Sequence, residues 1–488
     1  MNSTNNGLVE KTISGIIWKF LERVGTQLVT VIVSLVLARI LMPEDYGIVA
    51  LVTVLIALCN VFVTNGLGSS LIQKKDADSL DFSTVFYTGL IVSAILYMLL
   101  FLSAPVIAHF YGNDLLSPVL RVMGLSLPVA AVNSVQQAYV SRRMIFRKFF
   151  FATLAGTVVS GAIGLTMAFS GCGVWALVGQ YTSNVLVNTF TLFWIVRWHP
   201  KWEFSFSRLK GLLSFGWKLF VSGFLDTGYN ELQSLVIGKK YSTEALAFYE
   251  KGREYPKFLA TSVNTSFSAV LFSAMSKVKD DPEKVKYATR RSIRTCSYLL
   301  MPCMTGIACI APVFTEVILG EKWLPMVPYM QMMCIVYAFW PIHTANLEAL
   351  KAMGRSDLYL TLEIIKKTTG IVALIVSMQF GVFWIAFSMI ITTFISAFVN
   401  AFPNRKLLKY GFGEQLLDIL PNIGLSFMMG LSVYFLRYLP LPRLVVLGLQ
   451  ILLGISVYIL VSFLFHSAEF AFLVSYIKRL WGKRKKYG

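Results

Sequence analysis

Charged residues are scarce in this chain of 488 residues: 14% are Asp, Glu, Lys or Arg, and 56% are hydrophobic. A soluble protein carries roughly 25% charged residues, which cover its surface against water. This deficit excludes an ordinary water-soluble fold and indicates a protein whose main solvent is lipid.

The motifs of soluble enzymes are also missing. The sequence has no P-loop, no GxSxG nucleophile motif and no HExxH metal motif, and its four histidines are scattered. Its six cysteines form no CxxC pair and lie in or beside apolar segments, which is typical of small buried residues. We therefore expect no enzyme, no ATP-driven pump within this chain, and no cofactor or metal.

A net charge of +19 raises the alternative of a nucleic-acid-binding protein. The basic residues fall in short clusters between apolar segments, however, as membrane topology signals do. There is no long basic helix and no platform of alternating aromatic and basic residues. We expect membrane lipids as partners, and no nucleic acid.

Long apolar segments dominate the chain, and a membrane-spanning helix needs about 20 mostly apolar residues. This length predicts an all-α polytopic membrane protein with about 14 transmembrane helices. The predicted spans are 15–41, 46–67, 82–106, 116–139, 149–170, 174–196, 211–237, 257–275, 295–318, 324–350, 357–379, 382–402, 414–436 and 443–465.

Lys and Arg are concentrated in every second loop, which orients the spans because cytoplasmic loops are enriched in these residues. This pattern predicts a multi-pass protein of the bacterial inner membrane with both termini in the cytoplasm. The segment 238–256 is the exception, because it would be an external loop with four basic residues. Within 276–294, Asp281 and Pro282 predict the start of a short basic amphipathic helix at the inner surface. The other external loops are too short for an external domain.

The spans divide into two blocks of six and a final pair. Trp18-Lys19 and Trp217-Lys218 open the two blocks in similar sequence contexts, which suggests a weak internal repeat. We predict an N-terminal six-helix lobe at 1–200, a C-terminal six-helix lobe at 201–410, and a further segment at 411–488. The last contains two accessory transmembrane helices and a basic cytoplasmic tail, and the two lobes are expected to surround a central cavity.

Polar and ionisable side chains fall on one helical face in three spans, and such groups in hydrocarbon usually face a bundle interior or a water-filled cavity. The candidate substrate-cavity residues are Lys19, Glu22, Arg23 and Gln27 in the first span, Lys218, Asp226 and Tyr229 in the seventh, and Lys366 and Lys367 in the eleventh. The alternatives are snorkelling to the interface for the lysines and structural ion pairing for the carboxylates.

The spacing within two of these faces indicates which charged residues can pair, and a third pattern indicates helix packing. Asp226 has no basic residue within one helical turn, so it either pairs with another helix or binds a cation or a proton. Glu363 can pair with Lys367 at i, i+4, which leaves Lys366 spare. In the fifth span Gly156, Ser160 and Gly164 repeat every four residues, a pattern of close helix packing and not of a substrate site.

The segments WKFLERVGTQ (18–27), LARILMPEDYG (37–47) and NGLGSSLIQKKD (65–76) resemble the polysaccharide transporter family of the multidrug/oligosaccharidyl-lipid/polysaccharide flippase superfamily. The resemblance is strongest to the branch that exports O-antigen, colanic-acid-like and teichuronic polymers. It extends along the chain in span count and two-lobe layout, and it weakens after about residue 410.

The resemblance implies alternating-access flipping of an undecaprenyl-diphosphate-linked oligosaccharide, with H+ or Na+ as the coupling ion and the polysaccharide polymerase machinery as a partner. Lys19, Arg23, Lys218 and Lys366 would then face the diphosphate, since Lys and Arg recognise phosphate. Asp226 departs from the cationic pattern expected of the second lobe. One alternative is an ion-coupled multidrug or metabolite antiporter of the same superfamily. The other is a membrane-bound polysaccharide polymerase or ligase, which needs a large external loop.

Overall fold

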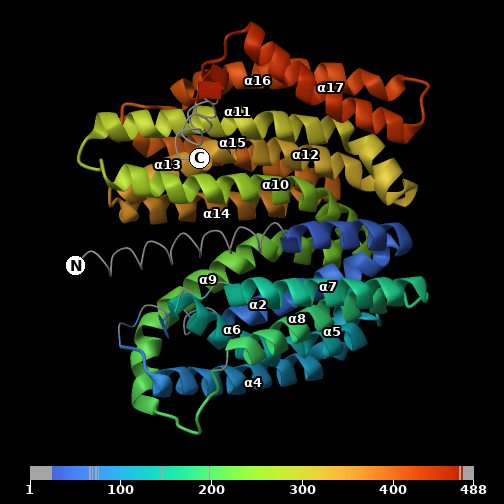
Figure 1. The fold of residues 1–488 in the computed structure, drawn as a ribbon, viewed down its shortest axis with the longest axis vertical. Coiled ribbons are helices and arrows are strands. Elements are labelled where there is room, and N and C mark those ends of the chain that lie inside the picture. Colours follow the sequence, from blue (N-terminus) through green and yellow to red (C-terminus); the bar gives the residue numbers. More distant parts are fainter. Residues whose placement is uncertain are drawn as a thin grey trace, which may run out of the picture. The chain divides into compact units, whose positions relative to one another are not determined.

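The computed structural model describes residues 25–64, 68, 70–71, 74, 76–143, 145, 147–196, 198–471 and 474–475. Within these residues all regular secondary structure is helical (Figure 1). The chain divides into two compact units, Met1–Ala247 and Phe248–Gly488. The domain boundaries near residues 200 and 410 remain a prediction.

The helices of the first unit include one for each of the first seven predicted spans. They are Gly25–Ile40, α2 (Pro43–Thr64), α4 (Ser79–Tyr111), α5 (Leu116–Gly124), α6 (Ser126–Arg143), α7 (Arg147–Phe169), α8 (Val174–Val196) and α9 (Phe206–Lys240). The fourth span consists of two helices, α5 and α6, which meet at Leu125.

The second unit contains most of α10, which begins in the first unit, and the helices that follow it. They are α10 (Thr243–Ser276), α11 (Pro282–Phe314), α12 (Val327–Ala338), α13 (Trp340–Ala352), α14 (Ser356–Ser377), α15 (Val382–Leu407), α16 (Phe412–Phe435) and α17 (Arg443–Leu464). Within the described residues, each predicted span falls largely on one helix or on a broken pair. An all-α polytopic architecture is therefore confirmed.

The tenth span is broken at Phe339, where α12 ends and α13 begins. Pro328 and Pro341 lie in the first turns of the two helices, where the missing N–H costs no intrahelical hydrogen bond. Prolines that weaken a single long helix therefore fit two shorter ones.

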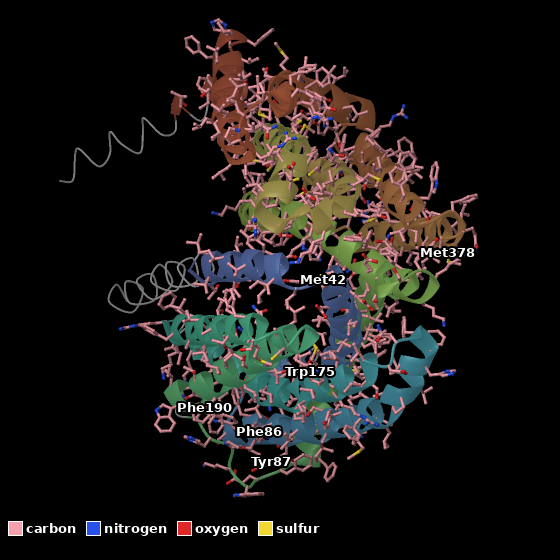
Figure 2. All side chains as sticks on the ribbon, turned by 90° about the vertical axis from the view of Figure 1, so that its right-hand side faces the viewer. Met42, Phe86, Tyr87, Trp175, Phe190 and Met378 are labelled. Atoms are coloured by element: carbon pink, nitrogen blue, oxygen red, sulfur yellow. The ribbon has the colours of Figure 1, made fainter. Side chains whose placement is uncertain are left out.

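Large apolar side chains cover the outside of both units. Phe190 and Trp194 on α8 are 68% and 73% exposed, and Phe427 on α16 is 66% exposed. Figure 2 shows Phe190 at the outer edge of its unit. Surfaces of this kind would cause aggregation in water, but they are stable in contact with lipid acyl chains. Eight helices among the described residues are long and apolar enough to cross a membrane, and α9 and α14, which carry two of the polar faces, are not among them.

Close packing of α7 against α8 confirms the small-residue pattern. A Cβ added to Gly156 would lie 3.0 Å from the Asn188 Cβ, and one added to Gly164 would lie 2.9 Å from the Gln180 Cβ. Between them, the hydroxyl of Ser160 accepts a hydrogen bond from Asn184 at 3.1 Å. Larger side chains at these positions would force the two helices apart.

Two segments predicted to lie between spans are helical instead. The turn between α9 and α10 is formed by Tyr241 and Ser242, so Lys251 and Arg253 belong to α10 and not to an external loop. They are 6% and 9% exposed and pair with acids on the same helix, Lys251 with Glu254 at 2.8 Å and Arg253 with Glu250 at 3.0 Å. Their charge is neutralised locally, which explains why they violate the loop pattern.

The basic segment before the ninth span is also continuous with it. Asp281 caps the helix by accepting from the Lys284 N–H, and Pro282 occupies the first turn, as predicted. The helix does not stop at the inner surface, however. It continues to Phe314 as α11, since no strong helix breaker follows before the apolar segment. The prediction of a separate short helix was therefore wrong.

The start of α4 is held by an ionic cluster in the first unit. Asp78 and Asp81 form a reciprocal capping box. The buried carboxylate of Asp81 pairs with Lys74 at 2.7 Å, and Arg208 lies 3.6 Å away. The hydrogen bond from the Asp81 N–H lowers the pKa of Asp78, and nearby Arg208 and Lys74 lower it further. This cluster ties the loop before α4 to the first turns of α9.

Candidate functional site

The first polar face is only partly described. Lys19, Glu22 and Arg23 lie outside the described residues, and Gln27 is half-buried on the helix Gly25–Ile40. One turn further along, the Thr30 hydroxyl donates to the carbonyl oxygen of Thr26 at 2.9 Å. Of the four predicted cavity residues in this span, Gln27 is the one that the structure describes. The cavity role of all four stays a prediction.

The polar face of α9 contains an amide–carboxylate pair. Asn230 Nδ2 donates to Asp226 Oδ2 at 3.2 Å, one helical turn along, and the Asp226 side chain is exposed on its unit. Tyr229 is half-buried on the same helix, and Lys218 lies within α9 with a side chain outside the described set. The polar face of α9 thus places an acidic, an amide and a phenolic side chain within one helical turn.

On α14 the ion pairing differs from the prediction. Lys366 forms a salt bridge with Glu363 at i, i+3, so it is not the spare cation that an i, i+4 pair between Glu363 and Lys367 would leave. The Lys366, Lys367 and Glu363 side chains are all half-buried. A helix places positions three and four residues apart on the same face, and sequence spacing alone does not choose between them.

A neutral polar pocket of about 330 Å³ lies within the first unit, and it was not predicted. It is bounded by the end of α2, by α6 and by α8. Its polar lining consists of Thr64, Asn133, Ser134, Gln137, Ser141, Asn184 and Asn188. None of these side chains carries a formal charge, and their amides and hydroxyls can donate and accept hydrogen bonds, which suits the pocket to a hydroxyl-rich ligand.

Hydrogen bonds fix the amides around this pocket. Asn133 Nδ2 donates to Asn188 Oδ1 at 3.2 Å and to the Thr189 hydroxyl at 2.8 Å, and Gln137 Nε2 donates to Asn133 Oδ1 at 2.7 Å. An amide offers two N–H donors and a carbonyl that accepts twice, more than these bonds use. The amides are thus held in position while retaining capacity for a ligand.

Spacing could have indicated this pocket. Asn133 and Gln137 are four residues apart on one span, and Asn184 and Asn188 are four apart on another, so each pair shares a helical face. Uncharged amides cost less to bury than charges, so Asn and Gln in a span indicate a binding site less strongly than ionisable groups do. These two amide pairs, each on one face of a predicted span, were the sequence feature that indicated the pocket.

A second polar group lies in the second unit, on α10, α13 and α15. Ser268 and Lys351 both donate to the nearly buried Glu348, at 2.8 and 3.1 Å. Nearby on α13, His343 contacts Asn400 at 3.1 Å. No group of three or more His, Cys, Asp or Glu in the described part of the chain is placed to hold a metal ion.

The chain is similar in sequence to proteins of polysaccharide biosynthesis. The chain is 23% identical over 449 residues to the lipopolysaccharide biosynthesis protein WzxC of Escherichia coli (strain K12), which covers 90% of this chain and 87% of that protein. It is 24% identical to the succinoglycan biosynthesis transport protein ExoT of Rhizobium meliloti (strain 1021), covering 73% of this chain and 72% of that one.

Among solved structures, the fold matches the inward closed conformation of the lipid II flippase MurJ. The TM-score is 0.73 at 16% identity, and the match covers 92% of this chain and 99% of that one. The likeness is therefore one of fold. A family model described as polysaccharide biosynthesis protein matches residues 36–328, more than half of the chain. The chain thus belongs to the polysaccharide biosynthesis protein family, in keeping with the resemblance in its first hundred residues.

Proposed function

We propose that this protein is a flippase for a lipid-linked oligosaccharide. Its substrate is the repeat unit of a surface polysaccharide carried on a polyprenyl diphosphate, and it moves that unit across the bacterial inner membrane by alternating access. Both termini lie in the cytoplasm, and H+ or Na+ drives the cycle. The completed repeat units then pass to the polysaccharide polymerase machinery.

The observation that carries this proposal is the neutral pocket of the first unit. An oligosaccharide presents many hydroxyl groups and no necessary charge, and side-chain amides fixed by mutual hydrogen bonds satisfy such groups without reorganisation. The printed names of WzxC and ExoT, a lipopolysaccharide and a succinoglycan biosynthesis protein, support a saccharide substrate. A drug antiporter would need an acidic or aromatic lining at this position.

The substrate has a second polar part, the diphosphate, and it needs cations. Lys19, Arg23, Lys218 and Lys366 remain our candidates, because guanidinium and ammonium groups bind phosphate oxygens through charge-assisted hydrogen bonds. Glu22, Gln27, Asp226, Tyr229 and Lys367 complete the proposed cavity. In this division the lysines and arginines bind the phosphates, the amides bind the sugars, and Asp226 contributes a carboxylate to binding of the coupling ion.

Deletion in the native organism tests the function. Loss of the chain should abolish the surface polysaccharide while lipid-linked repeat units accumulate on the cytoplasmic side, where added glycosidases or periodate cannot reach them in intact spheroplasts. A missing polymerase or ligase would instead leave unpolymerised or unligated units exposed at the outer leaflet. Unchanged polysaccharide together with a new sensitivity to cationic drugs would overturn the proposal in favour of the antiporter.

Variants in the complemented strain test the cavity. Arg23→Ala and Asp226→Ala should each lower export at equal protein levels, and Arg437→Ala, a cation that packs on Tyr434 and Tyr438, is the control for charge loss. Full export by both variants would show that these side chains do not contribute to the transport path.

A further inference from the structure

A cationic pocket of about 150 Å³ lies on the second unit, and none of its lining residues belongs to the proposed substrate cavity. It is formed by the early turns of α11 and by the segment that follows α17. Tyr287, Arg290, Arg291 and Arg294 line it from α11, and Glu469 lines it from the other side. Three guanidinium groups and one carboxylate thus face one small hollow.

Carboxylates hold two of the arginines in fixed positions. Arg290 donates from Nε and Nη2 to Asp418 Oδ1 at 3.0 and 2.7 Å, and Arg294 Nε donates to Glu469 Oε1 at 2.7 Å. Each guanidinium carries five N–H donors, more than these bonds use. With Arg291 the cluster contains three guanidinium groups and two carboxylates, so cations outnumber anions among these named groups.

These arginines are hydrogen-bonded to carboxylates but remain accessible. The Arg290 side chain is 49% exposed and the Arg294 side chain 34% exposed, whereas Asp418 and Glu469 are almost buried. Arg291 Nη1 donates to the Tyr287 hydroxyl at 2.7 Å, which orients a third guanidinium at the same place. Pre-organised donors of this kind bind an anion with little loss of side-chain entropy.

Exposed apolar residues directly precede the pocket's lining residues in the chain. Phe463, Leu464 and Phe465, at the end of α17, are 63%, 58% and 66% exposed and come just before the lining residue Ala468. Tyr287 itself is 63% exposed. A soluble anion has no apolar part that could contact these residues, whereas a lipid carries its phosphate next to its acyl chains. Basic pockets at the ends of transmembrane helices bind anionic head groups for this reason.

We propose that this pocket binds the phosphate of an anionic membrane lipid such as phosphatidylglycerol. The three arginines contact the phosphate, and the exposed aromatic residues contact the acyl chains. The site joins α11 to the segment after α17, so the bound lipid bridges two elements that the ion pair between Arg294 and Glu469 already connects. The proposal does not depend on the transported substrate.

Lipid titration of the purified full-length protein, held in neutral phosphatidylcholine nanodiscs, tests the site. Fluorescent phosphatidylglycerol should bind Arg291→Gln about fivefold more weakly than wild type, since one arginine contributes on the order of that factor to anionic lipid binding. Lys284→Gln is the matched control: it removes one positive charge from the same helix, at an exposed position outside the pocket. Equal weakening by both variants would show diffuse attraction and overturn the proposal.

Two further arms separate the remaining explanations. Glu469→Gln removes the negative charge from the pocket and should tighten phosphatidylglycerol binding, a result that a damaged fold cannot give. Unchanged or weaker binding would contradict the proposed contact. Inorganic phosphate at millimolar concentration should compete poorly, because it lacks acyl chains. Displacement of the lipid by phosphate at the same occupancy would identify a soluble anion site and overturn the lipid assignment.

Discussion

Asn346 and Gln415 exchange two side-chain hydrogen bonds: Asn346 Nδ2 donates to Gln415 Oε1 at 2.8 Å, and Gln415 Nε2 donates to Asn346 Oδ1 at 3.0 Å. Both side chains are fully buried. Asn404 on α15 joins them by donating to Asn346 Oδ1 at 2.6 Å. The first turn of α16 is therefore connected to α13 and α15 inside the second unit by complementary amides.

Replacing Asn346 by Leu should destabilise the protein by about 3 kcal/mol, because Gln415 and Asn404 would lose partners in a buried site. The measurement is unfolding in mixed detergent micelles, followed by tryptophan fluorescence. The double variant Asn346→Leu, Gln415→Leu should cost less than the sum of the two single changes. Additive costs would show that the amides do not act as a pair.

Gly47→Ala should be strongly destabilising, although it adds only a methyl group. A Cβ at this position would lie 1.7 Å from the carbonyl oxygen of Thr243, so backbone would have to move. We expect a loss of about 3 kcal/mol, the upper range for overpacking. Gly424→Ala on α16 meets nothing within 4 Å and should be neutral or slightly stabilising. Equal thermal stability of the two variants would contradict the close approach.

This contact explains part of what the sequence could and could not predict. The PEDYG segment was recognised as a family resemblance, but its glycine contacts Thr243, a residue far along the chain, which no local pattern reveals. Apolar length located the helices in the described part of the chain, because a helix that crosses lipid must satisfy its own backbone. Lys251 and Arg253 were misplaced because their partners, Glu254 and Glu250, lie on the same helix and neutralise them.

The candidate site was harder to predict than the fold. Charges in apolar segments were easy to find, yet whether Glu363 binds Lys366 or Lys367 depends on side-chain rotamers. The pocket amides were missed because Asn and Gln in a span are also compatible with ordinary helix packing. Only the structure shows that Asn133 and Asn188, on different helices, face each other.

The cap of α4 should respond to pH. The pKa of Asp78 is lowered in the folded protein, chiefly by the Asp81 N–H, so its contribution is complete above the unfolded value near 3.8 and is lost as the pH falls through the folded value. Hydrogen exchange of the first-turn amides of α4 should therefore accelerate below that range. Asp78→Asn keeps an acceptor and should remove this pH dependence, and Asp78→Ala should cost about 1 kcal/mol at neutral pH. An unchanged exchange profile in Asp78→Asn would assign the effect elsewhere.

Lys366 and Glu363 should respond differently to neutralisation if Lys366 contacts the diphosphate. Lys366→Met should lower the initial rate of lipid-linked oligosaccharide transport in proteoliposomes about tenfold, the effect of losing one charge-assisted hydrogen bond. Glu363→Gln frees the ammonium from its pair and should retain or raise the rate. Equal losses in both variants would indicate that the pair is only structural.

The neutral pocket should determine the preference for glycosylated substrate. Gln137→Ala and Asn184→Ala each remove a hydrogen-bonding group from the lining, which should slow transport of the complete lipid-linked oligosaccharide about fivefold. Transport of the same polyprenyl diphosphate without sugar should be unchanged, because the phosphates bind elsewhere in our proposal. Gln331→Ala is the control, since this amide donates to the Ala308 carbonyl oxygen at 3.1 Å in the second unit. If the variants slow both substrates equally, the pocket supports the fold and does not bind the sugar.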